Sequence, residues 1–259
     1  MTASHPPPRL PTWTRTLNER DACELLDLAE PGMALADWRA RGHERLPQAS
    51  RERRQELVRE VERDLLDHDG INIVPSTFLH HFHVEGPHHR QGLFIGRLLF
   101  GRDGVREVLS DLIHPALARA EEPLAIPDDA RIDARTWEHY LQDHLPLGTR
   151  PPARAKTRQT IQRHLAIAGV LDLAATPDTH ARRGRPAPIA FAWLVAHEMR
   201  ISGRAEAPMG WAMRESFAAR LFASEEAYAR SCIDAGVATD LLVSGYLAGH
   251  PRLHPGAGR

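Results

Sequence analysis

The sequence predicts a mainly α-helical protein in which an N-terminal helical domain is followed by one or two winged helix-turn-helix units. Three observations predict this. Apolar residues recur at helical spacing, glycine and proline end the segments, and the order helix, turn, helix, strand, loop, strand follows residue 130. A chain of 259 residues with 42% apolar content is long enough for a sizeable core. We expect a disordered leader over residues 1–15, the helical domain over 16–125, and the two units over 130–193 and 194–259.

The helical domain is expected from its caps and breakers. Ser50 is a favourable residue to precede a helix, because its hydroxyl can accept a backbone N–H of the first turn. The β-branched and aromatic stretch Ile71–His83 predicts a strand or a buried loop. Pro123 and Pro127 indicate a linker, so we place a domain boundary near residue 125. The expected helices are Ala22–Leu28, Leu35–Leu46, the helix from Ser50 to about His68, Gln91–Phe100 and Val105–Ala118.

The first winged helix-turn-helix unit is expected to begin with a helix over Arg135–His144. A turn containing proline and glycine separates it from a second helix over Ala155–Ala168, which Gly169 ends. The apolar stretch Val170–Ala174 predicts a strand. The polar loop Thr176–Arg185 then precedes a second apolar stretch, Pro186–Trp193, which predicts the returning strand.

The second unit repeats this order with helices over Ala190–Met199, Met209–Phe222 and Ser224–Ala235. Ser224 is a favourable N-cap, and Glu225 and Glu226 follow it where the helix dipole favours acids. Gly236 is expected to break or bend the last helix. The stretches Asp240–Ala248 and Arg252–His254 are expected to pair as strands around a turn at Gly249.

The charge of the chain is unevenly distributed. The formal net charge is −1, but the stretch from His144 to Ala187 holds eight basic residues and two acids, which leaves +6 there and −7 elsewhere. Only one of the 33 basic residues is a lysine, Lys156, so arginine abundance itself reflects a GC-rich coding bias. A basic island on an acidic chain is typical of a surface that binds a polyanion, and a solvated basic loop is the alternative.

A helical wheel for Ala155–Ala168 predicts which side chains contact DNA. With Ile161 and Leu165 facing the core, the outward face holds Lys156, Gln159, Thr160 and Arg163, which are residue types that bond phosphates and base edges. Five further arginines are expected to neutralise phosphates, two at the helix entrance and three at the tip of the wing. These are Arg150, Arg154, Arg182, Arg183 and Arg185. Seven or eight such contacts predict a steep salt dependence of binding.

The corresponding helix of the second unit gives a different prediction. Glu225, Glu226 and Asp234 outnumber Arg230 on it, and like charges repel phosphate. We therefore expect this acidic unit to stay out of a DNA groove and to bind a protein partner or a second copy of the chain. A winged-helix unit used only for protein contacts is the alternative for the first unit as well.

The histidine cluster His80–His89 is the one candidate for a metal site. In an extended chain His81 and His83 would share a face, with Glu85, His88 or His89 as a third ligand. A histidine-rich surface loop is the favoured explanation of the cluster, because the spacing matches no known metal motif. The sequence has no phosphate-binding loop, dinucleotide fingerprint or nucleophile elbow. We expect no enzymatic activity and no cofactor.

The hydropathy of the chain predicts no contact with a membrane. Mean hydropathy is −0.41, and no apolar run approaches eighteen residues. The first thirteen residues contain four prolines and no apolar segment of the kind a signal peptide needs. Two cysteines, Cys23 and Cys232, do not make a disulfide framework, which fits the bacterial cytoplasm.

Two stretches resemble the BrxA-type accessory proteins of BREX phage-defence islands. In Leu46–Leu66, Leu-Pro-Gln-Ala-Ser-Arg-Glu-Arg-Arg leads into an amphipathic helix, which is similar to a hydrophobic–polar turn and basic helix of that family. In Trp137–Leu171, the run Thr157–Ile161 is followed by Ala168-Gly169-Val170-Leu171, similar to the family's helix that enters a winged-helix strand. The resemblance covers about half of the chain. It implies an all-helical, non-catalytic protein of winged-helix character that binds double-stranded DNA within a defence system.

Three functions follow from these predictions. The first is a non-catalytic double-stranded DNA-binding protein that acts as an accessory or regulatory subunit. The second is an adaptor that docks on a larger complex through protein contacts. The third is a metal-dependent enzyme built on His80–His89.

Overall fold

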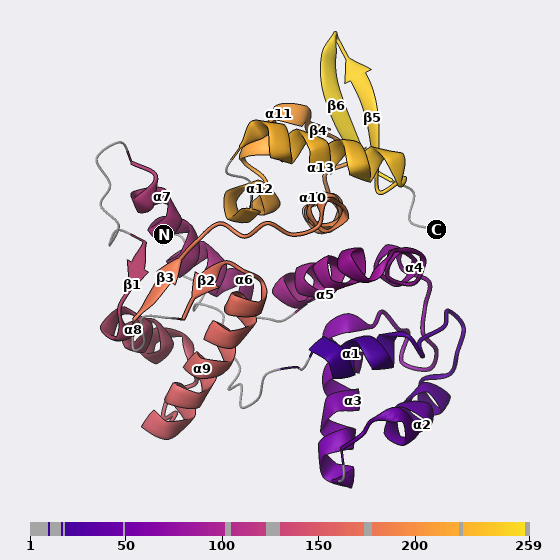
Figure 1. Ribbon diagram of the computed structural model, residues 1–259, viewed down its shortest axis with the longest axis vertical. Coiled ribbons are helices and arrows are strands. Elements are labelled where there is room, and N and C mark those ends of the chain that lie inside the picture. The colour runs from indigo at the N-terminus through magenta and orange to yellow at the C-terminus, as the bar shows by residue number, and fades with distance from the viewer. Residues whose placement is uncertain are drawn as a thin grey trace, which may run out of the picture. The chain divides into compact units, whose positions relative to one another are not determined.

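The computed structural model describes Leu10, Leu17 and residues 19–48, 50–101, 105–122, 130–173, 178–222 and 225–256. Most of these residues are helical, and two three-stranded antiparallel sheets hold the strands (Figure 1). The chain divides into two compact units. One unit joins Met1–Thr16 to Arg102–Gly184, and the other joins Leu17–Gly101 to Arg185–Arg259. We call the first the inserted unit and the second the split unit, because Arg102–Gly184 interrupts the second along the chain.

The first half of the split unit consists of five helices. Two begin at serines that act as caps: the Ser50 hydroxyl accepts the N–H of Arg53 at 3.4 Å, and the Ser76 hydroxyl accepts that of Leu79 at 3.2 Å. The prediction of a helix after Ser50 is confirmed, although that helix ends at Leu65 and not near His68. The five helices are α1 (Glu19–Leu26), α2 (Leu35–Arg45), α3 (Arg51–Leu65), α4 (Thr77–Val84) and α5 (Pro87–Gly101).

The second half of the split unit is built around helix α10. Every residue from Ile189 to Ala196 is buried, because α5 and α13 pack against opposite parts of this helix. The chain then forms two short helices, a longer one and a hairpin. The elements are α10 (Pro188–Ile201), β4 (Ala207–Pro208), α11 (Met209–Arg214), α12 (Phe217–Phe222), α13 (Glu226–Ala238), β5 (Leu242–Leu247) and β6 (His250–Pro255).

Small residues bring the partner helices close to α10. A Cβ atom added at Gly92 of α5 would lie 2.8 Å from the Cβ atom of Ala190, and one added at Gly236 of α13 would lie 2.4 Å from that of Ala192. The sequence predicts that Gly236 breaks or bends its helix, and the prediction of a break is wrong. The helix continues to Ala238, and the glycine is required for a close approach.

The inserted unit has an order of elements similar to that of the second half of the split unit. A helical stretch runs through α6 (Val105–Val108), the π-helical turn η1 (Leu109–Ile113) and α7 (His114–Ala120). Next come a short strand, two helices and two strands. These are β1 (Arg131–Ile132), α8 (Ala134–His144), α9 (Pro151–Ile167), β2 (Leu171–Asp172) and β3 (Thr179–Ala181).

The core of the inserted unit is organised by Trp137 of α8. Its side chain is fully buried, and its indole N–H donates to the Thr179 hydroxyl on β3 at 3.0 Å. The Thr179 hydroxyl in turn donates to the backbone carbonyl of Ile132 on β1 at 3.3 Å. One helix and two strands are thereby joined by satisfied polar contacts in an apolar interior.

The same succession of elements occurs twice. We call residues 105–181 the first module and residues 188–255 the second module. Each runs helix, strand, helices, strand, strand, and each sheet has its last strand in the centre, in the orders β1-β3-β2 and β4-β6-β5. All strand pairs are antiparallel, with Ile132 opposite Thr179 in the first sheet and Ala207 opposite Leu253 in the second.

Several predicted elements differ from the structure. Pro186–Trp193 leads into helix α10 and is not a strand, and the strand that returns is β3, which lies inside the stretch expected to be a polar loop. The prediction of a strand or buried loop over Ile71–His83 is wrong for its second half, because α4 begins at Thr77. The predicted N-cap Ser224 lies outside the described residues.

The division into units also differs from the predicted boundaries near residues 125 and 193. The helical stretch 105–120 belongs to the inserted unit, where Asp111 accepts a hydrogen bond from the Tyr140 hydroxyl at 3.4 Å. Most of the predicted leader, 1–15, lies outside the described residues. Leu10 is described, and it is buried with its N–H donating to the His144 carbonyl at 2.6 Å.

No helix in the described part of the chain is both long enough and apolar enough to cross a lipid bilayer.

Candidate nucleic-acid interface

Helix α9 carries the surface that the sequence predicts to contact DNA. The helix begins after Arg150 with Pro151 and Pro152, whose rings suit the first helical positions. Ile161 and Leu165 are fully buried on its inner side. Thr157 and His164 are buried as well, so only a narrow strip of this helix is exposed.

That strip consists of Lys156, Gln159 and Arg163, which we call the α9 stripe. The three side chains are spaced by three and four residues, so they lie on one face of the helix, and all three are exposed. None of them forms a hydrogen bond or an ion pair through its side chain with another described residue. The stripe therefore offers two cationic groups and an amide that are free to bind a ligand.

Thr160 is the one residue of the predicted outward face that is not on the surface. It is only 3% exposed, so the prediction that it faces a groove is wrong. The helical wheel placed it at the margin of the exposed arc. The structure extends the buried arc over it, because Thr157 and His164 on the same side are covered too.

Three of the arginines predicted to neutralise phosphates are paired within their own unit. Arg154 binds Glu138 at 2.7 Å between Nε and Oε1, and it also donates to the Thr149 carbonyl at 2.8 Å. Arg183 forms a two-pronged pair with Glu121, one arm of which measures 2.8 Å. Arg183 also lowers the pKa of the Glu121 carboxyl, chiefly through these hydrogen bonds.

Arg185 belongs to the split unit, whereas α9 belongs to the inserted unit. It pairs with Glu225 at 3.4 Å and its guanidinium lies 5.7 Å from the centre of the Tyr228 ring. The acids that bind Arg154, Arg183 and Arg185 all lie outside the stretch that gave a charge of +6. The unpaired positive charge of the predicted site is therefore smaller than the sequence count.

The remaining predicted cations are Arg150 and Arg182. Both are exposed, and neither pairs with a described carboxylate. Arg182 does not lie at the tip of a wing, because it follows the returning strand β3, and its Nε donates to the Gly169 carbonyl at 3.1 Å. Residues 174–177, which connect β2 to β3, lie outside the described residues. Four free cations, Arg150, Lys156, Arg163 and Arg182, thus remain in the inserted unit from the predicted set.

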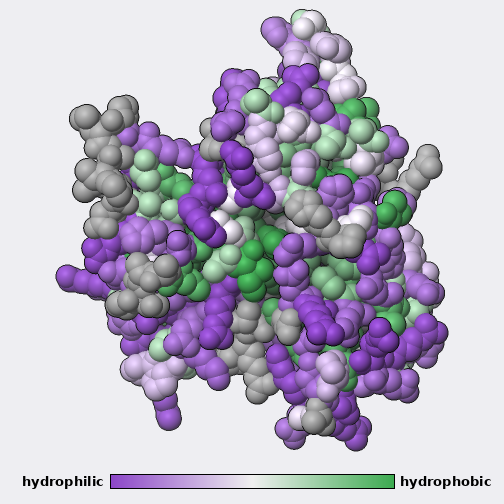
Figure 2. Space-filling model, in the orientation of Figure 1, coloured by the Kyte–Doolittle hydropathy of each residue, from purple (hydrophilic) through white to green (hydrophobic). Residues whose placement is uncertain are grey.

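The corresponding helix of the second module, α13, exposes acids as well as an arginine, and the hairpin after it exposes apolar side chains. On α13 the exposed residues include Glu226, Arg230 and Asp234, and Arg230 pairs with Asp234 at 3.3 Å. The hairpin β5–β6 exposes apolar side chains, with Val243 47%, Leu247 51% and Tyr246 81% exposed. Figure 2 shows pale and purple atoms with a little pale green at the tip of this hairpin, at the top of the view.

The excess of acidic residues expected for residues 194–259 is found only at the start of α13. Over that stretch the chain has seven acids and seven arginines, so its formal charge is balanced. Acids gather at the start of α13, whereas residues 241–259 contain none.

The histidine cluster does not have the geometry expected of a metal site. His81 and His83 belong to helix α4, where residues two apart point in different directions, so they do not share a face. His89 binds Glu85 at 2.8 Å, and His83 binds the Leu26 carbonyl at 3.0 Å. Within the described residues, no group of three or more histidine, cysteine, aspartate or glutamate side chains is placed to hold a metal ion.

The two cysteines have the environment of core residues. Burial raises the pKa of the Cys23 thiol to about 12, with Glu19 and Asp27 adding to the effect. Burial also raises the pKa of the Cys232 thiol. Both side chains are therefore protonated near neutral pH, which is the opposite of what a nucleophilic cysteine requires.

No protein-family model matches the chain, and no curated protein and no solved structure matches it either. The resemblance to BrxA-type proteins stays a prediction from the residues. The functional assignment therefore rests on the surfaces of the two modules.

Proposed function

We propose that this protein binds double-stranded DNA without catalysis and that the first module is a winged helix-turn-helix. The observation that carries the proposal is the α9 stripe, where Lys156, Gln159 and Arg163 are exposed together and free of described partners. In a helix-turn-helix the second helix of the pair lies in the major groove, and α9 follows α8 after a six-residue connection.

The arrangement of the first module supports this assignment. A helix, a strand, two helices and a two-stranded hairpin that closes on the first strand is the order of a winged helix-turn-helix. Arg150 at the start of α9 and Arg182 after β3 are placed on either side of the helix along the chain. Both are suited to contact phosphates, whereas the amide of Gln159 is suited to a base edge.

The proposal is tested by fluorescence anisotropy with a labelled duplex of random sequence. We expect the wild-type protein to bind in low salt and the double variant Lys156→Ala/Arg163→Ala to lose on the order of a hundredfold in affinity. The matched control is Arg214→Ala/Arg230→Ala, which removes the same charge from exposed arginines of the second module. Equal loss in both double variants would mean that net charge and not α9 determines binding.

A second role is supported by the exposed hairpin of the second module. We propose that β5–β6 makes a protein contact, because Val243, Tyr246 and Leu247 expose apolar surface on a strand at the edge of its sheet. This corresponds to the adaptor function. Sedimentation velocity of the wild-type protein and of Tyr246→Ser/Leu247→Ser tests self-association, and the same pair of proteins can be mixed with a candidate subunit.

The resemblance of two stretches to BrxA-type proteins suggests one setting for both roles. On that basis we propose an accessory subunit of a phage-defence system. Plaque counts from cells that carry the defence genes with the wild-type protein or with the Lys156→Ala/Arg163→Ala variant test this proposal. Undiminished protection by a folded variant would separate DNA binding from defence.

A further inference from the structure

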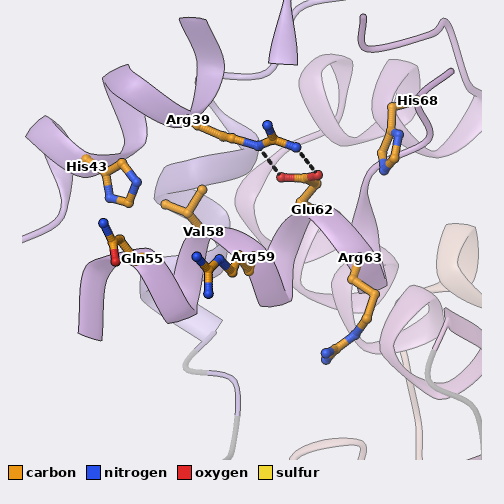
Figure 3. A pocket seen from close by; sticks show the side chains of 8 residues that line it. All are labelled: Arg39, His43, Gln55, Val58, Arg59, Glu62, Arg63 and His68. Carbon is orange, nitrogen blue, oxygen red and sulfur yellow. Dashed lines mark hydrogen bonds and ion pairs between the residues drawn. The ribbon is translucent and has the colours of Figure 1, made fainter. Parts of the chain in front are cut away.

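A pocket of about 640 Å³ opens between helices α2 and α3 of the split unit. Figure 3 shows its lining, in which His43 from α2 and Gln55 from α3 face each other and the Arg39–Glu62 pair lies farther along the groove. Val58 is the one apolar side chain among the eight described residues that line it. The others are Arg39, His43, Gln55, Arg59, Glu62, Arg63 and His68.

Two of the cations in the pocket are neutralised. Arg39 binds Glu62 with both arms, at 2.7 and 2.5 Å, and this contact lowers the pKa of the Glu62 carboxyl. Arg63 binds Asp64 in the same way, at 2.7 and 3.0 Å, and Figure 3 shows its side chain directed away from the Arg39–Glu62 pair. The single carboxylate of the lining is therefore already occupied by an arginine.

Three polar side chains of the pocket have no such contact. His43, Gln55 and Arg59 form no hydrogen bond or ion pair with another described residue through their side chains. The Nδ1 atom of His43 is nonetheless shielded from solvent. Because this atom is closed to a ligand as well as to water, the groups of the lining that are open to a ligand are the Gln55 amide, the Arg59 guanidinium and the rest of the His43 ring.

The electrostatic environment of His43 is positive. Burial lowers the pKa of His43, and the charges of Arg54, Arg51 and Arg59 lower it further. The three charged groups that act on His43 are thus all arginines of α3, the helix that faces it. An anion in the pocket would counteract this field.

We propose that this pocket binds a phosphate-type anion, with the Arg59 guanidinium as its charge partner and the Gln55 amide and the His43 ring N–H as further donors. Guanidinium and amide N–H groups match the oxygens of a phosphate. The pocket is larger than one phosphate group, so the anion can be free phosphate, a mononucleotide or a phosphate of the DNA backbone. The site lies in the split unit and is distinct from the α9 stripe.

The test follows the His43 ring by NMR while ligand is added to the full-length protein. The probes are inorganic phosphate, a mononucleotide and a short DNA duplex, and a His43→Gln variant assigns the resonance. We expect the pKa of His43 to rise on binding, because an anion stabilises the protonated ring. No change with any of the three probes would overturn the proposal.

Arg59→Ala is the diagnostic variant, because this exposed side chain has no described partner and its loss leaves the fold intact. We expect it to weaken binding by on the order of tenfold to a hundredfold, and Arg59→Lys to restore part of the affinity. Arg41→Ala is the matched control, since it removes an exposed arginine of α2 that does not line the pocket. Equal binding by Arg59→Ala and Arg41→Ala would contradict the assignment.

The three probes distinguish the source of the anion. A response to phosphate and mononucleotide that Arg59→Ala removes assigns the pocket to a small ligand. A response to the duplex alone, again removed by Arg59→Ala, assigns it to the DNA backbone. The Lys156→Ala/Arg163→Ala variant keeps the pocket intact, so failure of the α9 proposal leaves the phosphate response unchanged.

Discussion

The two modules share an order of elements and a strand order but present different surfaces. In the first module the second helix of the pair, α9, exposes Lys156, Gln159 and Arg163 next to strands of two or three residues. In the second module α13 exposes Glu226 and an Arg230–Asp234 pair next to strands of six residues. The comparison teaches that two modules with the same order of elements can expose helices of different charge.

The largest effect is expected from breaking the first module at its core. Trp137→Ala removes a fully buried side chain and the hydrogen bond to Thr179, so we expect the free energy of unfolding to fall by about 3–5 kcal/mol. Chemical denaturation followed by circular dichroism measures it. A loss below about 1 kcal/mol would mean that the sheet and α8 do not share this core.

The salt dependence of DNA binding sharpens the contrast between paired and free cations. Four free cations predict that log K falls against log salt with a slope of about −3.6, and hence a loss of on the order of a hundredfold between 50 and 200 mM. A slope near −6.3, as expected for seven cations, would show instead that DNA displaces the glutamates from Arg154, Arg183 and Arg185. Anisotropy titrations at four salt concentrations give the slope.

Two neighbouring residues of α9 separate binding from stability. Gln159→Ala should weaken DNA binding by up to about tenfold with little effect on unfolding, because its side chain is exposed. Thr160→Ala should lower the free energy of unfolding by about 1 kcal/mol and leave affinity nearly unchanged, because its side chain is buried. Paired anisotropy and denaturation curves check both; a reversed pattern would place the helix in another rotation.

The smallest effect on stability is expected at the hairpin of the second module. Tyr246→Ser should change the free energy of unfolding by less than about 0.5 kcal/mol, because 81% of the residue is exposed. Self-association or partner binding should weaken in the same variant. Thermal denaturation and sedimentation velocity make the comparison, and a marked loss of stability would assign the tyrosine to the fold of its own module.

Much of the helical structure can be predicted from local signals. The helix after Ser50 and the pair α8–α9 follow from a capping serine, apolar spacing and a turn of proline and glycine, which all act within a few residues. The strand β3 cannot be predicted in this way, because Thr179–Ala181 has only three residues and no apolar run. Its strand partner β1 lies almost fifty residues earlier in the chain. Pro186–Trp193 is wrongly predicted as a strand because a buried helix and a buried strand have the same apolar composition.

The candidate site shows the same limit. The exposed positions of α9 follow from helical spacing around Ile161. The neutralisation of Arg183 does not, because Glu121 is 62 residues away in the sequence. Charge counted within a window therefore overestimates the charge that is free on a folded surface.

The insertion of one unit into the other has a consequence for synthesis. When the chain has emerged as far as Gly184, the inserted unit has all of its strands, but the split unit lacks α10. Until that helix arrives, the side of α5 around Gly92 has nothing to pack against, although α5 left the ribosome some ninety residues earlier. We expect a nascent chain in this interval to expose the apolar side of α5 that α10 later covers.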